Sequence, residues 1–143
     1  MISYSEPSCT QSTDVSALRR IGYYSLSTLE RPCDVMEPAQ IPAGALTHIN
    51  IAFIQFTDQW EIDDSSYGAQ VAEIASLKDT HLGLRVSISV GGWDFNDGST
   101  ATYFSDMAST SANRKTFINS VVRYLVKYGL DGIDIGGSGQ LRW

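Results

Sequence analysis

The sequence predicts an α/β fold with a parallel sheet, and two features of the chain support this prediction. Short apolar runs rich in Ile, Val and Phe recur along it, and amphipathic segments with helical spacing lie between them. Parallel strands need long crossovers, which helices between the strands supply with right-handed geometry. The expected strands are residues 21–24, 46–56, 84–90 and 130–135, the expected helices are 67–79 and 114–128, and a short helical turn is expected at 37–40.

The first two strands are joined by a polar connection. The run IGYY begins at Ile21, and Pro38 later favours a short helical turn, because proline suits the first helical position. The run LTHINIAFIQF, from Leu46 to Phe56, is the longer strand, and its Ile and Phe residues are typical of strands. His48 lies within this run, so we expect it in the core with its ring nitrogens hydrogen-bonded.

The two helices are predicted by the spacing of their apolar side chains. In residues 67–79 these side chains are Val71, Ile74, Ala75 and Leu77. The segment 114–128 is the clearer helix and ends at Gly129, because glycine is favoured just after the last helical turn. One buried face of this helix is expected to carry Phe117, Ile118, Val121, Val122, Leu125 and Tyr128.

The composition limits the classes of function. The 143 residues are 43% hydrophobic, which is enough for one sizeable core, and the formal net charge is -6 with a pI of about 4.7. An acidic chain without a Lys/Arg run is a poor binder of nucleic acid or of an anionic membrane. A sugar or a protein is the better partner. No stretch approaches the roughly 18 apolar residues of a membrane span.

The N-terminal segment and the Cys and His residues give weaker signals. Residues 1–19 are polar and rich in Ser and Thr, which predicts a disordered leader or linker without the apolar segment of a secretory signal peptide. Cys9 and Cys33 either take part in disulfides or are unrelated, and two cysteines leave both alternatives open. Neither His48 nor His81 has a plausible set of neighbouring ligands, so no metal or cofactor is expected.

The third expected strand ends in the run SISVGGW. In a parallel sheet the residues at the carboxyl ends of the strands form the functional site. Gly91 and Gly92 allow a tight turn and a close approach of a ligand to the backbone, and Trp93 offers a flat apolar face for a sugar ring. An ordinary strand-to-helix turn with a packed tryptophan is the alternative that residue types alone leave open.

The fourth expected strand carries the run DGIDIG. Because side chains alternate along a strand, Ile133 and Ile135 are expected to face the covering helices. Asp134 and positions 136 and 138 are then expected to face the opposite side of the sheet. A carboxylate directed into an interior is costly unless it is hydrogen-bonded or functional. Asp131 precedes the strand, and a simple turn residue is one reading of it.

These two runs resemble the motifs of glycoside hydrolase family 18 chitinases, which carry S-x-G-G on the third strand and D-G-x-D-x-D-x-E on the fourth. Here the first motif is complete in residues 89–92, and the second is followed through residues 131–135. The chain is also similar to the fungal killer-toxin-like subgroup of the family, in residues 31–36, 40–42, 47–53 and 91–97.

The resemblance implies that residues 20–135 are the N-terminal half, about four β/α units, of a TIM (β/α)8 barrel. Length alone favours a small doubly wound sheet, because a whole barrel needs about 250 residues. Residues 136–143 depart from the family pattern, and the chain is expected to be truncated within the barrel. The outer strands of a half-barrel are open edges, so self-association through them is expected.

The resemblance also implies endo-hydrolysis of chitin, the β-1,4-linked polymer of N-acetylglucosamine, by a substrate-assisted retaining mechanism. In that mechanism a Glu protonates the glycosidic oxygen, and an Asp orients the N-acetyl group that attacks the anomeric carbon. This chain has Ser138 and Gly136 at those positions, and a hydroxyl is far too weak an acid for the task. Ser89, Asp131 and Asp134 are the expected supporting network, so the chain alone is expected to be inactive.

Binding of chitin or chito-oligosaccharides is the remaining expectation, with no nucleic acid and no membrane as partner. A non-catalytic chitinase-like lectin is therefore the alternative to an enzyme, and a small α/β domain with an unrelated role is a third hypothesis. The family implies an extracellular location. The expected substrate-binding residues are Tyr23, Phe53, Gly91, Gly92 and Trp93.

Overall fold

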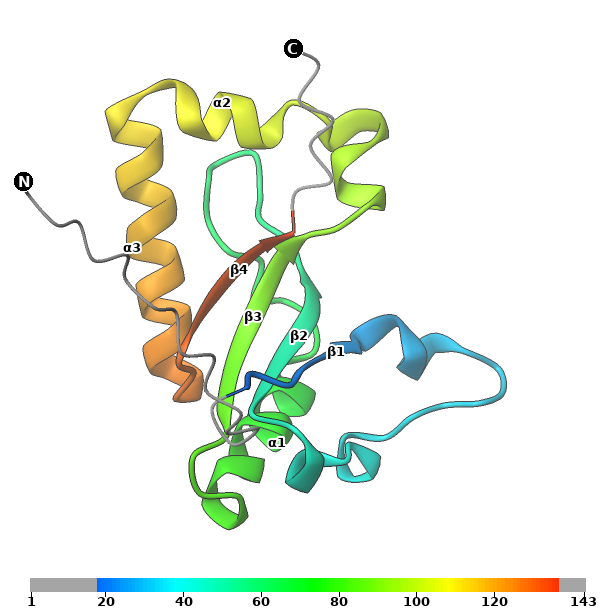
Figure 1. Ribbon diagram of the computed structural model, residues 1–143. Helices are drawn as coiled ribbons and strands as arrows, with labels where there is room; N and C mark the ends of the chain where they lie inside the picture. Colours follow the sequence, from blue (N-terminus) through cyan, green and yellow to red (C-terminus); the bar gives the residue numbers. More distant parts are fainter. Residues whose placement is uncertain (1–17, 137–143) are drawn as a thin grey trace, which may run out of the picture.

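The computed structural model describes residues 18–136, and their centre is one parallel four-stranded sheet. Its strand order is β1-β2-β3-β4, so every strand lies beside the next one in the chain (Figure 1). This arrangement confirms the predicted α/β fold with parallel pairing. The strands are β1 (Ile21–Ser25), β2 (His48–Ile54), β3 (Arg85–Gly91) and β4 (Gly132–Gly136).

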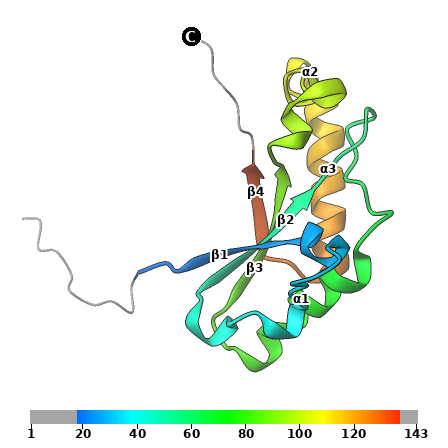
Figure 2. The ribbon, with the colours of Figure 1, turned by 90° about the vertical axis from the view of Figure 1, so that its right-hand side faces the viewer.

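The helices lie on one side of this sheet (Figure 2). They are α1 (Gly68–Thr80), α2 (Tyr103–Ser109) and α3 (Ser111–Tyr128). The α1 and α3 helices were predicted, and α3 begins earlier than expected because the Thr110 side chain accepts a hydrogen bond from the Asn113 N–H and caps it. The seven-residue α2 was not predicted. Its apolar residues Tyr103, Phe104 and Met107 pack against the core, but so short a segment gives only one turn of the helical spacing.

Short 3-10 turns complete the connections. The turn predicted at residues 37–40 is present as Pro38–Gln40, and proline occupies its first position as expected. The connection between β1 and β2 is built from three such turns instead of a helix, and the loop after β3 contains two more. The 3-10 turns are Leu26–Glu30, Pro38–Gln40, Ala43–Ala45, Asp94–Asn96 and Gly98–Thr100.

The core lies between the helices and the outer face of the sheet. Alternate strand residues such as Ile49, Ile51, Val86, Ile88 and Val90 are buried there. An aromatic cluster continues the core past the carboxyl ends of the strands, where Phe56 is its centre. Its ring centroid lies 4.9 to 5.1 Å from those of three other rings, namely Phe95, Phe104 and Phe117.

The buried face predicted for α3 is only partly correct. Ile118 and Val122 were expected to be buried, but their side chains are 56% and 53% exposed. The buried residues of α3 are Phe117, Ser120, Val121 and Tyr124. A face centred on residues 117, 121 and 124 leaves Ile118 and Val122 on its flank, because each lies 100° further around the helix. The apolar stripe of α3 is therefore wider than the part of the helix that the rest of the described chain buries.

An uncovered apolar wall results along α3 and β4. It consists of Ile118, Val122, Val126, Ile133 and Ile135, each between 37% and 76% exposed. The expectation that Ile133 and Ile135 face covering helices is therefore met only in part. The strand β4 is also an edge of the sheet, so its outer backbone groups lack a neighbouring strand among the described residues.

Other residues singled out in the sequence have ordinary surroundings. His48 is half-buried at the start of β2, and its Nδ1 lies 2.8 Å from the Thr47 hydroxyl. Cys33 is exposed, and Cys9 lies outside the described residues. Within residues 18–136, no helix is long and apolar enough to span a membrane, and no group of His, Cys, Asp or Glu is arranged to hold a metal ion.

The uncovered wall and the open edge of β4 lead us to expect self-association of this chain. We expect Ile135→Lys to weaken it, because a charge on this apolar surface opposes burial and a lysine at a strand edge opposes pairing. Sedimentation velocity over a range of concentrations measures the effect. Leu82→Lys is the control, since Leu82 is 97% exposed and belongs to a different surface. A wild-type chain that is monomeric at every concentration contradicts the prediction.

Candidate functional site

Three side chains from three strands meet on the inner face of the sheet, opposite the helices. The Ser89 hydroxyl of β3 donates a hydrogen bond of 2.7 Å to Asp134 Oδ2 on β4. The Tyr23 hydroxyl of β1 donates to the same oxygen at 3.1 Å. Asp134 Oδ1 accepts no hydrogen bond from residues 18–136. One carboxylate oxygen of Asp134 is thus held by two hydroxyl groups, and the other has no hydrogen-bond donor among the described residues.

The register of the strands explains why these residues meet. Ser89 lies directly opposite Asp134 in the β3–β4 pair, and Ser89 is completely buried. Tyr23 belongs to β1, which is separated from β4 by two strands, yet its hydroxyl reaches the Asp134 carboxylate. A long phenol that crosses two intervening strands requires a concave inner face, as in the wall of a barrel.

Glycines hold together the carboxyl ends of β3 and β4. Gly91 and Gly92 have φ values of 106° and 94°, a region that favours glycine. The Gly92 N–H donates to the Gly136 carbonyl at 2.8 Å, and the Asn96 side-chain amide donates to the carbonyls of Gly92 and Gly136. A Cβ at Gly91 would lie 2.8 Å from the Phe104 ring. These contacts fix the start of the loop that carries Trp93.

A hollow of about 490 Å³ opens beside these strand ends. Gly91, Gly92 and Trp93 line one side of it, and Trp93 is 70% exposed. The loop after β1 and the connection between β2 and α1 form the other side. Three carboxylate side chains belong to this lining, from Glu30, Asp63 and Asp94. The surroundings suit a neutral or cationic ligand with an apolar ring face.

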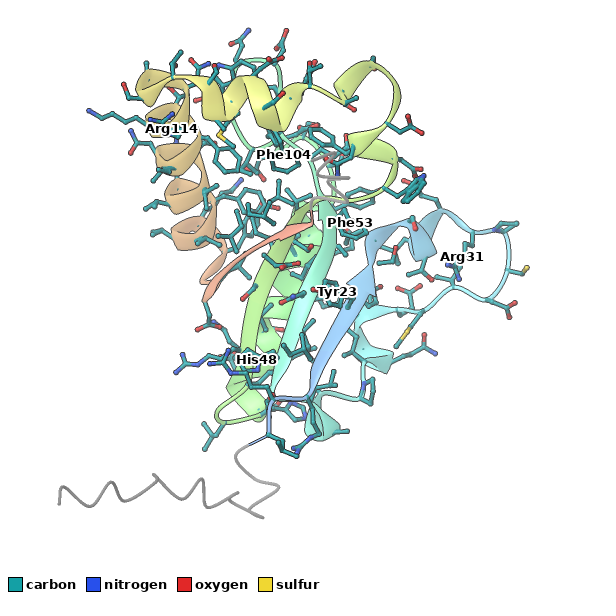
Figure 3. All side chains as sticks on the ribbon, turned by 45° about the horizontal axis from the view of Figure 1, so that its top comes forward. Tyr23, Arg31, His48, Phe53, Phe104 and Arg114 are labelled. Carbon is teal, nitrogen blue, oxygen red and sulfur yellow. The ribbon has the colours of Figure 1, made fainter. Side chains whose placement is uncertain are left out.

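Phe53 lies at the edge of the hollow, with its ring close to Gly92 and Gly136. It is 43% exposed, lines the hollow, and lies on the same inner face of the sheet as Tyr23 (Figure 3). The predicted substrate-binding residues thus fall into two groups. Phe53, Gly91, Gly92 and Trp93 border the hollow, whereas Tyr23 belongs to the cluster with Ser89 and Asp134.

Asp131 is not brought to this cluster. It precedes β4 and therefore lies at the opposite end of the strand, where its carboxylate accepts hydrogen bonds from the Val86 N–H, Lys78 and Arg85 at 2.8 to 3.1 Å. Partial burial alone would raise the pKa of Asp131, but these three donors outweigh it, so the pKa of Asp131 is lowered. The carboxylate ties α1, β3 and the start of β4 together.

Of the two positions that depart from the family pattern, one belongs to the described residues. Gly136 is the last residue of β4 and pairs with Gly91, and Ser138 lies outside the described residues. Sequence reasoning missed Asn96 and Phe104, which secure the glycine backbone. Both come from the segment after β3, and no spacing in the sequence signals that it folds back over the strand ends.

Parallel strands with helical crossovers and a site at their carboxyl ends define part of a (β/α)8 barrel. The model of the family "Glycosyl hydrolases family 18" matches residues 19–136, so the chain belongs to this family. The predicted fold and the predicted family are therefore both confirmed.

Named relatives agree with this assignment. The chain is 34% identical over 127 residues to the killer toxin subunits alpha/beta of Kluyveromyces lactis, covering 88% of this chain and 10% of the relative. It is 32% identical over 128 residues to a probable chitinase of Penicillium expansum, covering 87% of this chain and 9% of that protein. The chain thus spans about a tenth of the length of these relatives.

A solved structure extends the comparison to three dimensions. Catalytic domain 2 of a Group II chitinase from Ostrinia furnacalis, a mutant in complex with penta-N-acetylchitooctaose, superimposes with a TM-score of 0.71 at 25% identity. The match covers 80% of this chain and 30% of that one. The four strands and three connections described here therefore correspond to less than a third of a solved chitinase chain.

The contacts of Asp131 predict how this chain responds to acid. We expect Asp131→Asn to lower the free energy of unfolding near neutral pH by about 1–2 kcal/mol, because a buried N–H and two cations lose a charged acceptor. A lowered folded pKa means that this stabilisation is present above about pH 4, the ordinary pKa of an unfolded Asp, and is lost as pH falls through the lower folded value.

Urea unfolding followed by far-UV circular dichroism, repeated from about pH 7 down to about pH 3, measures this difference. The gap between wild type and Asp131→Asn should close in the acid range. Asp58→Asn is the matched control, because Asp58 is exposed and lies outside this cluster. An equal loss of stability in both variants would count against the role assigned to Asp131.

Proposed function

We propose that this chain binds chitin or chito-oligosaccharides at the carboxyl ends of β1–β4, as part of the substrate cleft of a family 18 glycosidase. The convergence of Tyr23 and Ser89 on Asp134 Oδ2 is the observation that supports it most directly. A carboxylate fixed on one oxygen keeps the other oriented for a ligand, so no reorganisation is needed when the ligand arrives.

The exposed aromatic residues support a sugar as the ligand. Trp93 exposes 70% of its surface at the edge of the hollow, next to the backbone of Gly91 and Gly92. Aromatic rings suit a site where one partner face is apolar and its rim is hydrogen-bonding, which describes a pyranose ring. The Ostrinia furnacalis domain, which shares this fold, was solved with an N-acetylated chito-oligosaccharide.

The chemistry of the family would need two further carboxylic groups. In substrate-assisted retention an Asp at position 136 would orient the N-acetyl group, and a Glu at position 138 would protonate the leaving oxygen. A Cβ at Gly136 would lie 3.0 Å from Ser89 Oγ, so a carboxylate at this position would extend the Ser89–Asp134 pair. Gly136 and Ser138 supply neither group, and we propose that this chain by itself binds without hydrolysing.

A non-catalytic, chitinase-like lectin is the second candidate. Gly136 favours it, because this described residue of the motif lacks any side chain while the aromatic border of the hollow is kept. An extracellular location belongs to both proposals, since chitin is met outside the cell. The two candidates differ in whether the chain belongs to a cleft that hydrolyses chitin or acts only as a binding module.

Trp93 is expected to contribute to binding through its exposed ring. We expect Trp93→Ala to weaken the affinity for chitotetraose about five- to tenfold, which corresponds to the roughly 1 kcal/mol of an aromatic contact. Isothermal titration calorimetry measures the dissociation constant. Leu82→Ala should leave it unchanged, because Leu82 lies away from the hollow. Absence of any binding by the wild type would contradict the proposal.

Hydrolysis is expected to be absent. We expect no release of fluorophore from a methylumbelliferyl chito-oligosaccharide at any pH between about 4 and 8, because no acid with a suitable pKa stands at position 138. An active family 18 chitinase in the same assay is the positive control. Turnover by this chain above the buffer rate would show that a different group protonates the leaving oxygen.

A further inference from the structure

The hollow at the carboxyl ends of the strands carries negative charge without a cation to balance it. Glu30, Asp63 and Asp94 belong to its lining, and within residues 18–136 no Lys, Arg or His does so. Every ion pair in this part of the chain is formed by a carboxylate outside the hollow. Charges of one sign that line a concave surface raise the local concentration of ligands with the opposite charge.

Each of the three carboxylates keeps at least one oxygen free to accept a hydrogen bond. The Tyr67 hydroxyl, which also lines the hollow, donates to Oε1 of Glu30 and leaves Oε2 without a donor from the described residues. The Ser65 N–H donates to Oδ1 of Asp63 at 2.9 Å. The Asp94 carboxylate accepts no hydrogen bond from residues 18–136, so it depends on water or a ligand for its partners.

Trp93 supplies a second and independent attraction for a cation. Its side chain is 70% exposed and belongs to the lining of the hollow. The face of an indole ring attracts cations more strongly than any other aromatic side chain. The described residues contain one cation–π contact, between Lys127 and Tyr128, so the Trp93 ring is available to a ligand. An exposed indole among free carboxylates suits a ligand that carries both an apolar ring face and an ammonium group.

We propose that the hollow binds glucosamine units with a free, protonated amine, so that deacetylated or partly deacetylated chitin is the preferred ligand. The inference rests on the proposed function, because it concerns the chemical form of the saccharide in the same cleft. A pyranose ring stacks on Trp93 whether or not it is acetylated. An ammonium group adds a positive charge and three N–H donors for the carboxylates, whereas an N-acetyl group is neutral and offers one.

Isothermal titration calorimetry with two tetrasaccharides tests the preference. At about pH 6, where carboxylates are ionised and amines are protonated, we expect the glucosamine tetramer to bind about five- to tenfold more tightly than chitotetraose. In about 1 M NaCl the Debye length is about 3 Å, so the preference should fall to about twofold or less. Equal or weaker binding of the glucosamine tetramer at low salt would overturn the proposal.

A charge-removing variant locates the preference in the hollow. We expect Asp94→Asn to reduce the preference for the glucosamine tetramer about two- to threefold, because the substitution removes a carboxylate that makes no hydrogen bond within the described chain. Asp58→Asn is the matched control, since it changes the net charge equally and Asp58 is exposed outside the hollow. An equal loss in both variants would show that the net charge of -6 attracts the cation, and the proposal would fail.

NMR separates failure of this inference from failure of the proposed function. We expect the glucosamine tetramer to shift the amide resonances of Gly91 and Gly92 and the indole N–H resonance of Trp93. If chitotetraose shifts them and the glucosamine tetramer does not, the preference is refuted and the proposed function stands. If neither saccharide shifts them, both fail. If tetralysine shifts them with the affinity of the glucosamine tetramer, the hollow recognises any cation and the proposal is overturned.

Discussion

The close pairing of β3 with β4 at their carboxyl ends is the constraint on which the site depends. Gly91, Gly92 and Gly136 bring the two backbones together without side chains between them, and the Gly92 N–H bonds to the Gly136 carbonyl. Two residues below, this register sets Ser89 opposite Asp134, where their side chains meet at 2.7 Å. Burial of an unpaired carboxylate would be costly, so the hydroxyl partners are what allow an acidic residue on this face.

The two faces of the sheet differ in composition and in burial. The outer face carries Ile and Val side chains that pack under α1 and α3 and supply most of the apolar burial. Apart from Tyr23 and Phe53, which are both partly exposed, the inner face carries small and polar residues, so it contributes little apolar burial and is free to hold a ligand. The apolar wall along α3 and β4 breaks this division, because Ile133 and Ile135 belong to the outer face and yet remain exposed within residues 18–136.

Several features of the site could be predicted from residue types and alternation. The period of two along β4 predicted that Asp134 faces away from Ile133 and Ile135, and the double glycine after Ser89 marked the carboxyl end of a strand. The place of Asp131 was not predicted, because its three donors come from α1 and β3, which are far away in the sequence. The width of the buried stripe on α3 was also overestimated, since spacing shows which side chains share a face but not how much of it is covered.

The sequence by itself determined the order of the elements, the parallel sheet and the family, because these depend on local periodicity and on motifs read residue by residue. Only the tertiary structure decided that Tyr23 reaches Asp134 across two intervening strands and that the Phe53 ring lies next to Gly92 and Gly136. Both contacts depend on the curvature of the sheet and on the path of the chain after β2. Curvature arises from the packing of the whole sheet against its helices, so no single stretch of residues encodes it.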